Sequence, residues 1–223
     1  SRLSADGMKE AYGISKFDNI IVASGADYPD ALAGSYLANV KRAPVLLTGT
    51  DANSEAAVKQ YISTNLNSGG TVYILGGTGV VTSRFESSLS NVNVRRLGGS
   101  SRYETNIEIL QAAGAGNEDL LVCTGEGFAD SLSASAVGKP ILLSAKSGLN
   151  YNQQAYLDSL NINDIYLIGG EGVVTDYTGQ QLDRYDDDGR CERIAGQSRY
   201  QTSVAVARKF FPGGAGNVVL AYA

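Results

Sequence analysis

The stretch SGADYPDALAGSYLA, residues 24–38, decides the fold, because it returns as TGEGFADSLSASAVG at residues 124–138. Three further pairs follow in the same order: APVLLT (43–48) and KPILLS (139–144), VYILGGTGVVT (72–82) and IYLIGGEGVVT (165–175), and RLGGSSRYET (96–105) and RIAGQSRYQT (193–202). Paired segments lie between 93 and 100 residues apart, whereas solenoid repeats span roughly 20–50 residues. The sequence therefore predicts whole domains in tandem.

These repeats divide the 223 residues into two full modules and part of a third. We expect module one at residues 1–98, module two at 99–195 and the start of an incomplete third module at 196–223. In the third module, residues 218–221 align with the apolar residues 20–23, which gives it one helix and one strand. Because a lone strand cannot bury both of its faces, we expect the parent chain to continue.

Each module alternates helices and strands. In module one, strands are expected at 19–23, 44–48, 71–75 and 92–97, and helices at 1–13, 29–40, 53–66 and 82–89. The third helix is expected to take Asn53 or Ser54 as its N-cap. Continuous apolar strands separated by helices indicate a parallel sheet covered on both faces. The predicted fold class is therefore α/β, with tandem three-layer modules, each built on a roughly four-stranded parallel sheet flanked by helices.

The composition excludes several classes of protein. The chain has no histidine and no tryptophan. It therefore has neither Ser-His-Asp nor Cys-His catalysis and no histidine-containing zinc site. It also lacks the indole platforms of many sugar-binding surfaces, although 13 tyrosines remain. The net charge of −5 argues against a nucleic-acid partner, and no apolar run approaches the length of a membrane span.

The cysteines and the most acidic segment predict neither a cofactor nor a metal. Cys123 ends an apolar run and is expected to pack as a small hydrophobic residue, while Cys191 lies in a polar segment, so the two do not form a disulfide framework. In DRYDDDGR, residues 183–190, three aspartates are contiguous and no glutamate follows Gly189 at the spacing of a calcium loop. An acidic surface turn is expected there.

Asp30 and Asp130 occupy equivalent places, after a strand and at the start of a helix. A carboxylate there can accept backbone N–H bonds and is favoured by the positive end of the helix. A catalytic role needs a second acid, but Asp27 in module one is replaced by Gly127 in module two. We therefore expect each aspartate to cap and position its helix and to meet an arginine of the neighbouring module, with ligand contact as the alternative. No catalytic residue and no enzyme activity are expected.

Two glycine-rich turns, at Gly76–Gly77 and Gly169–Gly170, connect a strand to a helix. A dinucleotide-binding fingerprint needs a third glycine, but Thr82 and Thr175 stand in its place, and no acidic residue follows at the required distance. We favour a tight turn with unusual backbone angles. The alternative is an α/β nucleotide-binding or hydrolytic domain that uses this turn to hold a phosphate at a helix N-terminus.

Arginines gather where the modules meet. Of the 11 arginines, six lie at the two junctions: Arg95, Arg96 and Arg102, and then Arg190, Arg193 and Arg199. Guanidinium groups suit the recognition of phosphates and carboxylates, including those of extended polyanions. Alternatively, these arginines form salt bridges between modules or cap helices.

The ordered set of four paired motifs resembles the cell wall binding repeat 2 family of Gram-positive surface proteins. The resemblance rests on SRYET and SRYQT, on YPDALAGSYLA and FADSLSASAVG, on APVLLT and KPILLS, and on YILGGTGVVT and YLIGGEGVVT followed by RLGG and RIAG. It covers essentially the whole chain. Module one departs from the pattern at Leu3, where the other modules have tyrosine.

The resemblance implies non-catalytic modules, usually three in tandem in a trimeric arrangement, that hold secreted proteins non-covalently on the cell wall. It implies an anionic wall polymer, teichoic-acid-like or another secondary polysaccharide, bound near module interfaces, and an effector domain elsewhere in the parent chain. Arg102 and Arg199 match the family's module-opening arginine, with Arg2 as the counterpart in module one, and Asp30 and Asp130 match its aspartate.

Together, the junction arginines and the resemblance predict two sets of site residues. The expected ligand-binding residues are Arg2, Arg95, Arg96, Arg102, Arg193 and Arg199. The expected structural or ligand-proximal residues are Asp30, Asp130, Tyr103, Tyr200, Gly76, Gly77, Gly169 and Gly170.

Overall fold

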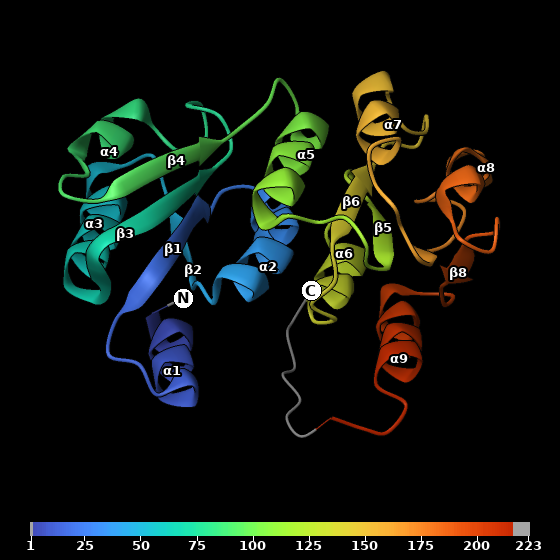
Figure 1. Cartoon of the computed structure of the whole chain (residues 1–223), viewed down its shortest axis with the longest axis horizontal. Helices are drawn as coiled ribbons and strands as arrows, with labels where there is room; N and C mark the ends of the chain where they lie inside the picture. Colours follow the sequence, from blue (N-terminus) through green and yellow to red (C-terminus); the bar gives the residue numbers. More distant parts are fainter. Residues whose placement is uncertain (1, 216–223) are drawn as a thin grey trace. The chain divides into compact units, whose positions relative to one another are not determined.

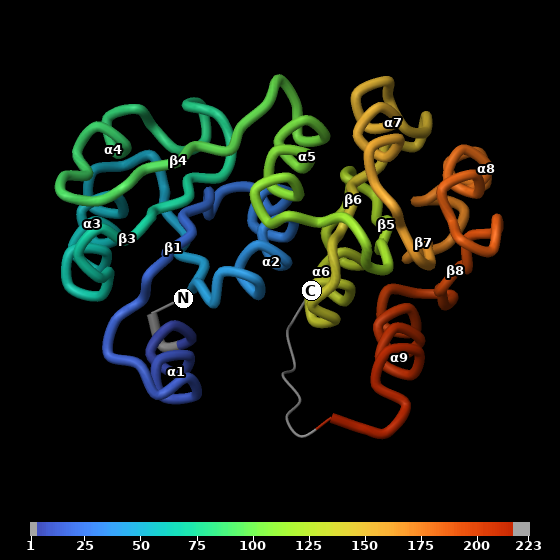
Figure 2. Tube along the Cα trace, viewed as in Figure 1, coloured from blue at the N-terminus to red at the C-terminus, as the bar shows by residue number. Residues whose placement is uncertain are grey.

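The computed structural model describes residues 2–215, with side chains from Ser4 onward. The strand expected at 218–221 and the side chain of Arg2 lie outside this described part. The chain divides into two compact units, Ser1–Ala115 and Gly116–Ala223, and Figure 2 traces their backbones. Helix α5, which opens module two in the sequence, belongs to unit 1 because it packs on α2. The module boundaries at 98 and 195 describe the repeat in the sequence and stay a prediction.

Unit 1 is a three-layer α/β fold (Figure 1). Its elements are α1 (Arg2–Tyr12), β1 (Phe17–Ser24), α2 (Pro29–Lys41), β2 (Val45–Thr48), α3 (Ala52–Asn65), β3 (Leu66–Leu75), α4 (Ser83–Ser88), β4 (Asn93–Leu97) and α5 (Arg102–Ala113). The strands are parallel in the order β2-β1-β3-β4, with Ile21 paired to both Val45 and Tyr73, and Tyr73 paired to Arg95. The predicted α/β class and four-stranded parallel sheet are therefore confirmed.

Helices cover both faces of this sheet, which explains why the central strands are apolar along their whole length. On one face, Ile20 and Val22 of β1 pack in a core with Ile62 of α3 and Phe85 of α4. On the other face, α2 approaches so closely that a Cβ on Gly34 would lie 2.5 Å from Cδ1 of Leu75. Helix α2 can therefore approach the sheet this closely only because residue 34 has no side chain.

Two local predictions need correction. Asp51 caps α3 by accepting hydrogen bonds from the backbone N–H groups of Asn53 and Ser54, so neither Asn53 nor Ser54 is the N-cap. Strand β3 begins at Leu66 and not at Thr71, because Leu66 pairs with Phe17 before the register shifts along β1.

Unit 2 repeats the same plan. Its elements are β5 (Leu120–Thr124), α6 (Ala129–Ser135), β6 (Ile141–Ser144), α7 (Tyr151–Leu157), β7 (Ile165–Ile168), α8 (Asp176–Leu182), the 3₁₀ helix η1 (Asp183–Tyr185), β8 (Glu192–Ile194) and α9 (Arg199–Phe210). The parallel strand order is β6-β5-β7-β8. Along β7, Tyr166 meets Phe210 of α9 with ring centroids 5.1 Å apart. The next residue, Leu167, faces Gly179 of α8 on the opposite side of the sheet.

Among the residues that the structure describes, no helix has the length and apolar character needed to cross a membrane.

Candidate functional site

The strand order places one edge of each sheet at a topological switch point. In unit 1 the chain leaves β1 towards β2 on one side and returns to β3 on the other, so the carboxyl ends of β1 and β3 flank this point. Open α/β sheets bind ligands in the crevice at this position. The loops that begin at Gly25 and Gly76 meet there, and in unit 2 the loops that begin at Gly125 and Gly169 take their places.

The glycine that ends β3, and its counterpart that ends β7, are both required by the backbone. Gly76 has φ +92° and Gly169 has φ +116°, a region that side chains rarely adopt. A Cβ on Gly169 would also lie 2.7 Å from the carboxylate of Asp130, and a Cβ on Gly76 would meet the carboxylate of Asp30. The predicted tight turn with unusual angles is confirmed. By contrast, a Cβ on Gly77 or Gly170 would meet open space, and neither has positive φ.

Asp30 and Asp130 therefore lie against the glycine turn, but they do not cap their helices. The N-caps of α2 and α6 are Tyr28 and Phe128, which make no side-chain capping bond, and each aspartate lies inside the first turn. The capping prediction is wrong for both residues. Burial raises the pKa of Asp30, as does the neighbouring Asp27, while Arg102 lowers it. Burial likewise raises the pKa of Asp130, with Arg199 acting in the opposite direction.

The helix that starts at the arginine of each following repeat packs on the helix of this aspartate. Arg102 is the first residue of α5, which packs on α2, and Arg199 is the first residue of α9, which packs on α6. Each arginine is thus near enough to lower the pKa of its aspartate, while a direct contact between the two side chains stays a prediction. Asp27, which is glycine in module two, forms an ion pair with Arg102, with its carboxylate 3.7 Å from the guanidinium group.

Unit 2 lacks this second acid. With Gly127 in place of Asp27, Arg199 instead lies over the ring of Phe128, 5.8 Å from its centroid. The two sites share an aspartate and an arginine but differ in the place of the other acid of the loop, which is Asp27 in unit 1 and, one residue earlier in the repeat, Glu126 in unit 2.

A short motif positions each arginine. Before α5, Gly99 donates its N–H to Oγ1 of Thr105 at 3.0 Å, and Ser101 caps the helix by accepting from the N–H of Tyr103 at 3.1 Å. Gly99 also has no room for a side chain, because a Cβ there would lie 2.7 Å from the carbonyl carbon of Glu104. The glycine, serine and threonine of this motif therefore act together to start α5 at Arg102.

Similar contacts start α9. Gly196 donates to Oγ1 of Thr202 at 3.1 Å, and Ser198 accepts from the N–H of Gln201 at 3.4 Å. The sequence-based prediction missed the roles of these glycines and threonines, although their recurrence beside the arginine was a signal that could have revealed them.

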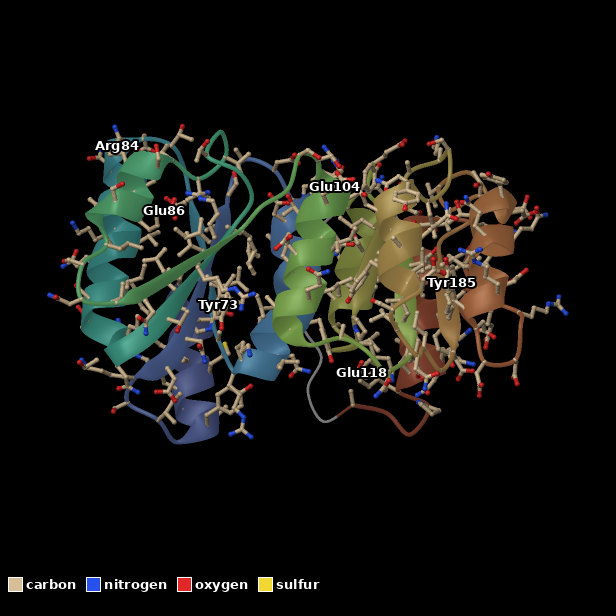
Figure 3. The ribbon with its side chains drawn as sticks, turned by 45° about the horizontal axis from the view of Figure 1, so that its top comes forward. Tyr73, Arg84, Glu86, Glu104, Glu118 and Tyr185 are labelled. Atoms are coloured by element: carbon tan, nitrogen blue, oxygen red, sulfur yellow. The ribbon has the colours of Figure 1, made fainter. Side chains whose placement is uncertain are left out.

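Arg96 and Arg193 stabilise the glycine turns from within. Arg96 donates to the carbonyl of Gly76 at 2.8 Å and of Val81 at 3.0 Å, and it pairs with Glu86 of α4, which is labelled in Figure 3. Arg193 donates to the carbonyls of Gly169 and Val174 at 2.8 and 2.7 Å and pairs with Asp176. These guanidinium groups fix the loop that borders each aspartate.

The other predicted site residues differ in exposure. Arg95 is exposed and, within the described residues, its side chain forms no hydrogen bond or ion pair. Tyr103 is half-buried in unit 1, whereas Tyr200 is 68% exposed in unit 2.

The acidic segment of unit 2 is a structural turn. Asp187 and Asp188 are exposed, as expected of a surface turn, but Asp186 is buried and accepts a 2.7 Å hydrogen bond from the N–H of Ile165 at the start of β7. Its other oxygen accepts from the N–H groups of Asp188 and Arg190. No group of acidic or cysteine side chains in the described part is arranged to hold a metal ion, and Cys123 and Cys191 are both free thiols.

Comparison with known proteins gives a family match and several relatives. The family described as Cell wall binding domain 2 (CWB2) matches residues 4–86 and 96–178. The chain is 26% identical over 198 residues to N-acetylmuramoyl-L-alanine amidase LytC of Bacillus subtilis; the match covers 85% of this chain and 37% of LytC. The chain thus spans little more than a third of that relative.

Two solved structures share the fold. Cwp8 from Clostridium difficile superposes with a TM-score of 0.81 at 28% identity, over 95% of this chain and 37% of Cwp8. Cwp6 from the same bacterium superposes with a TM-score of 0.77 over 94% of this chain and 34% of Cwp6. At 24% identity, the likeness to Cwp6 concerns the fold alone.

Proposed function

This chain belongs to the cell wall binding domain 2 family, and we propose that it holds a secreted protein non-covalently on the Gram-positive cell wall by binding an anionic wall polymer. In this proposal the chain performs no catalysis, and the effector domain lies elsewhere in the parent protein. The amidase LytC, of which only 37% is matched, supports such a division of labour. A trimeric arrangement of modules stays a prediction.

The observation that carries this proposal is that both units place an arginine at the start of a helix near the topological switch point. Arg102 and Arg199 are placed by similar glycine, serine and threonine contacts, at the same edge of two similar sheets. A guanidinium group that starts a helix at this edge adds its charge to the positive helix end, so both favour an anion. Two such positions in one chain let a repeating polymer bind twice, which raises the overall affinity.

The remaining predicted residues take different parts in this site. Arg95 is exposed and adds a further positive charge to the outer side of β4. Arg96 and Arg193 act as positioning residues, because their donors are engaged by the glycine turn. The open space above Gly77 and Gly170 lets a ligand approach the backbone directly.

The nucleotide-binding alternative is not favoured by the geometry. Thr82 caps α4 by accepting from the N–H of Phe85 at 3.0 Å, and it donates to the Glu55 carboxylate at 2.5 Å. A phosphate at this helix start would therefore face a carboxylate, and α4 itself spans only six residues.

Retention on purified cell walls tests the proposal. Walls of Bacillus subtilis and Clostridium difficile are loaded with the chain at 0.1 M and 1 M NaCl. Arg102→Ala with Arg199→Ala is expected to weaken retention at low salt by about tenfold or more, because charge-assisted hydrogen bonds contribute ~1.5–3 kcal/mol each. Salt should weaken the wild type in the same way.

A charge-matched control separates specific binding from net charge. Lys59→Ala with Arg208→Ala removes the same charge from exposed helix positions of the two units. This control is expected to bind like the wild type. Equal losses in both double variants, or retention of the Arg102 and Arg199 variant at the wild-type level, would refute the proposed role of these arginines.

A further inference from the structure

Two strongly exposed aromatic side chains lie at helix starts in unit 2. Tyr151, the first residue of α7, is 83% exposed, and Tyr177, the second residue of α8, is 56% exposed. Single exposed apolar residues need no explanation. Two exposed rings at the starts of two helices at one edge of a sheet do, because both side chains are mostly outside the core.

Both tyrosines lie at the edge of the sheet that holds Asp130 and Gly169. Helix α7 follows β6 and helix α8 follows β7, and the carboxyl ends of parallel strands meet at one edge. The hydroxyl of Thr175, the N-cap of α8, donates to the carbonyl of Lys146 in the loop before α7 at 3.3 Å. The two loops are therefore joined.

The loop before α7 supports the ring of Tyr177. This loop is closed by a hydrogen bond from the N–H of Gly148 to the carbonyl of Ala145 at 3.1 Å. Gly148 has φ +95°, and a Cβ there would lie 2.8 Å from Cε1 of Tyr177, so the ring lies directly on the glycine backbone. Gln181 holds the arrangement by accepting from the N–H of Leu149 at 2.8 Å and donating to the hydroxyl of Tyr177 at 3.5 Å.

Unit 1 has no such arrangement. Only Gly49 and Thr50 separate β2 from the N-cap Asp51, whereas five residues, 145–149, separate β6 from the N-cap Asn150. Ala52 and Arg84 stand at the helix positions of the two tyrosines, and Arg84, labelled in Figure 3, pairs with Glu55 at 2.8 Å. The longer loop and both aromatic rings are thus particular to unit 2, although the two cores share one plan.

We propose that Tyr151 and Tyr177 form a stacking platform for a saccharide ring of the wall polymer, at the same edge of the sheet as the Arg199 site of unit 2. This inference rests on the proposed function and names the chemistry of one part of the ligand. A pyranose ring presents an apolar C–H face, and tyrosine offers a rigid apolar ring with a polar hydroxyl at little cost in side-chain entropy. In a chain without tryptophan, tyrosine and phenylalanine are the residues that can supply such a platform, and tyrosine is the more frequent of the two.

The platform predicts a part of the binding that salt does not weaken. Contacts between arginine and an anion are screened at 1 M NaCl, whereas stacking on an aromatic ring is not. Tyr151→Ala with Tyr177→Ala is therefore expected to weaken binding of the full chain by about tenfold at 1 M NaCl, as for the loss of one or two stacked rings. The double phenylalanine variant keeps both rings and is expected to bind within about twofold of the wild type.

The test uses polysaccharide released from walls of Bacillus subtilis and Clostridium difficile, titrated into the full chain labelled with 3-fluorotyrosine. The resonances of Tyr151 and Tyr177, assigned by single replacement with phenylalanine, are expected to shift on binding. Tyr12→Ala removes another exposed tyrosine, on α1 of unit 1, and is expected to leave binding unchanged. Circular dichroism of each variant confirms that it is folded.

The outcomes separate the platform from the proposed function. Wild-type binding by the double alanine variant at 1 M NaCl, or unchanged resonances of both tyrosines during binding, overturns the platform. If the Arg102 and Arg199 variant loses retention while the tyrosine variants do not, only the platform fails. If the wild type is retained on neither wall and binds neither polysaccharide, the proposed function fails and the platform fails with it.

Discussion

Replacing each of two adjacent glycines by alanine tests the geometry of the glycine turn directly. Gly169 has φ +116°, whereas Gly170 has no positive φ and an open space around its Cβ position. The two variants add the same methyl group one residue apart. They differ only in what the backbone and the neighbouring atoms allow.

The expected cost of Gly169→Ala has two parts. Forcing a residue with a Cβ into the left-handed region costs ~1–2 kcal/mol. The new methyl group would also lie 2.7 Å from both the Asp130 carboxylate and Cγ2 of Val173, and relieving such overlap costs ~1–3 kcal/mol. The loss of unfolded-state entropy offsets about 0.4–1 kcal/mol. The expected net destabilisation is therefore ~1–5 kcal/mol.

For Gly170→Ala only the entropic part remains, so the expected effect is between zero and a stabilisation of about 1 kcal/mol. Urea unfolding of the full chain, followed by circular dichroism, measures both values at one pH and one temperature. Gly76→Ala and Gly77→Ala repeat the comparison in unit 1, where Gly76 has φ +92°. Equal unfolding free energies for Gly169→Ala and Gly170→Ala, within about 0.5 kcal/mol, would refute the steric reading of the turn.

Three further predictions concern single sites. Burial raises the pKa of Asp30, so the charged carboxylate destabilises the folded chain above that pKa, and this cost disappears on acidification. Asp30→Asn should therefore raise the melting temperature at pH 7 and lose this advantage at low pH. A difference in melting temperature that does not change with pH would contradict this prediction. Asp186→Ala leaves the N–H of Ile165 unpaired and should lower the free energy of unfolding in urea by ~1–3 kcal/mol. Asp187 is exposed, so Asp187→Ala should lower it by under about 0.5 kcal/mol. Equal losses would contradict the role of Asp186 as the buried acceptor for Ile165. In Arg193→Lys, a single ammonium group replaces the planar guanidinium group that bonds the carbonyls of Gly169 and Val174 and pairs with Asp176. This variant should lower both the melting temperature and the retention on cell walls. Unchanged values of both would exclude the positioning role of Arg193.

The fold could be predicted from the sequence because the apolar segments are continuous and repeated. The strand predicted at 19–23 lies inside β1, and the helix predicted at 29–40 corresponds to α2 within one residue. Helix caps that depend on local side-chain contacts could not be predicted from the sequence pattern. Asp51 displaced Asn53 and Ser54 as the N-cap because its carboxylate accepts from both of their N–H groups.

Only part of the candidate site could be predicted from the sequence, because the sequence does not give the direction of each side chain. The repeat marked Asp30 and Arg102 as equivalent to Asp130 and Arg199, but it did not reveal that Arg96 is directed inward to the carbonyls of the glycine turn. Along a strand, neighbouring residues face opposite sides, so Arg95 and Arg96 are alike in sequence and opposite in environment. The direction of a side chain decides whether its charge is available to a ligand, and composition alone does not give that direction.

The proximity of Arg102 to Asp30 also shows that one site combines residues of two sequence repeats. In the sequence, the arginine opens a new module, but its helix packs on α2 and belongs to the compact unit of the preceding module. The same holds for Arg199, whose helix packs on α6 of unit 2. Each site therefore needs the glycine turn and aspartate of one repeat together with the first residues of the next. In the second and third repeats, the threonine near the opening arginine accepts from the glycine N–H before the helix, so these first residues help to start the helix that packs on the preceding repeat.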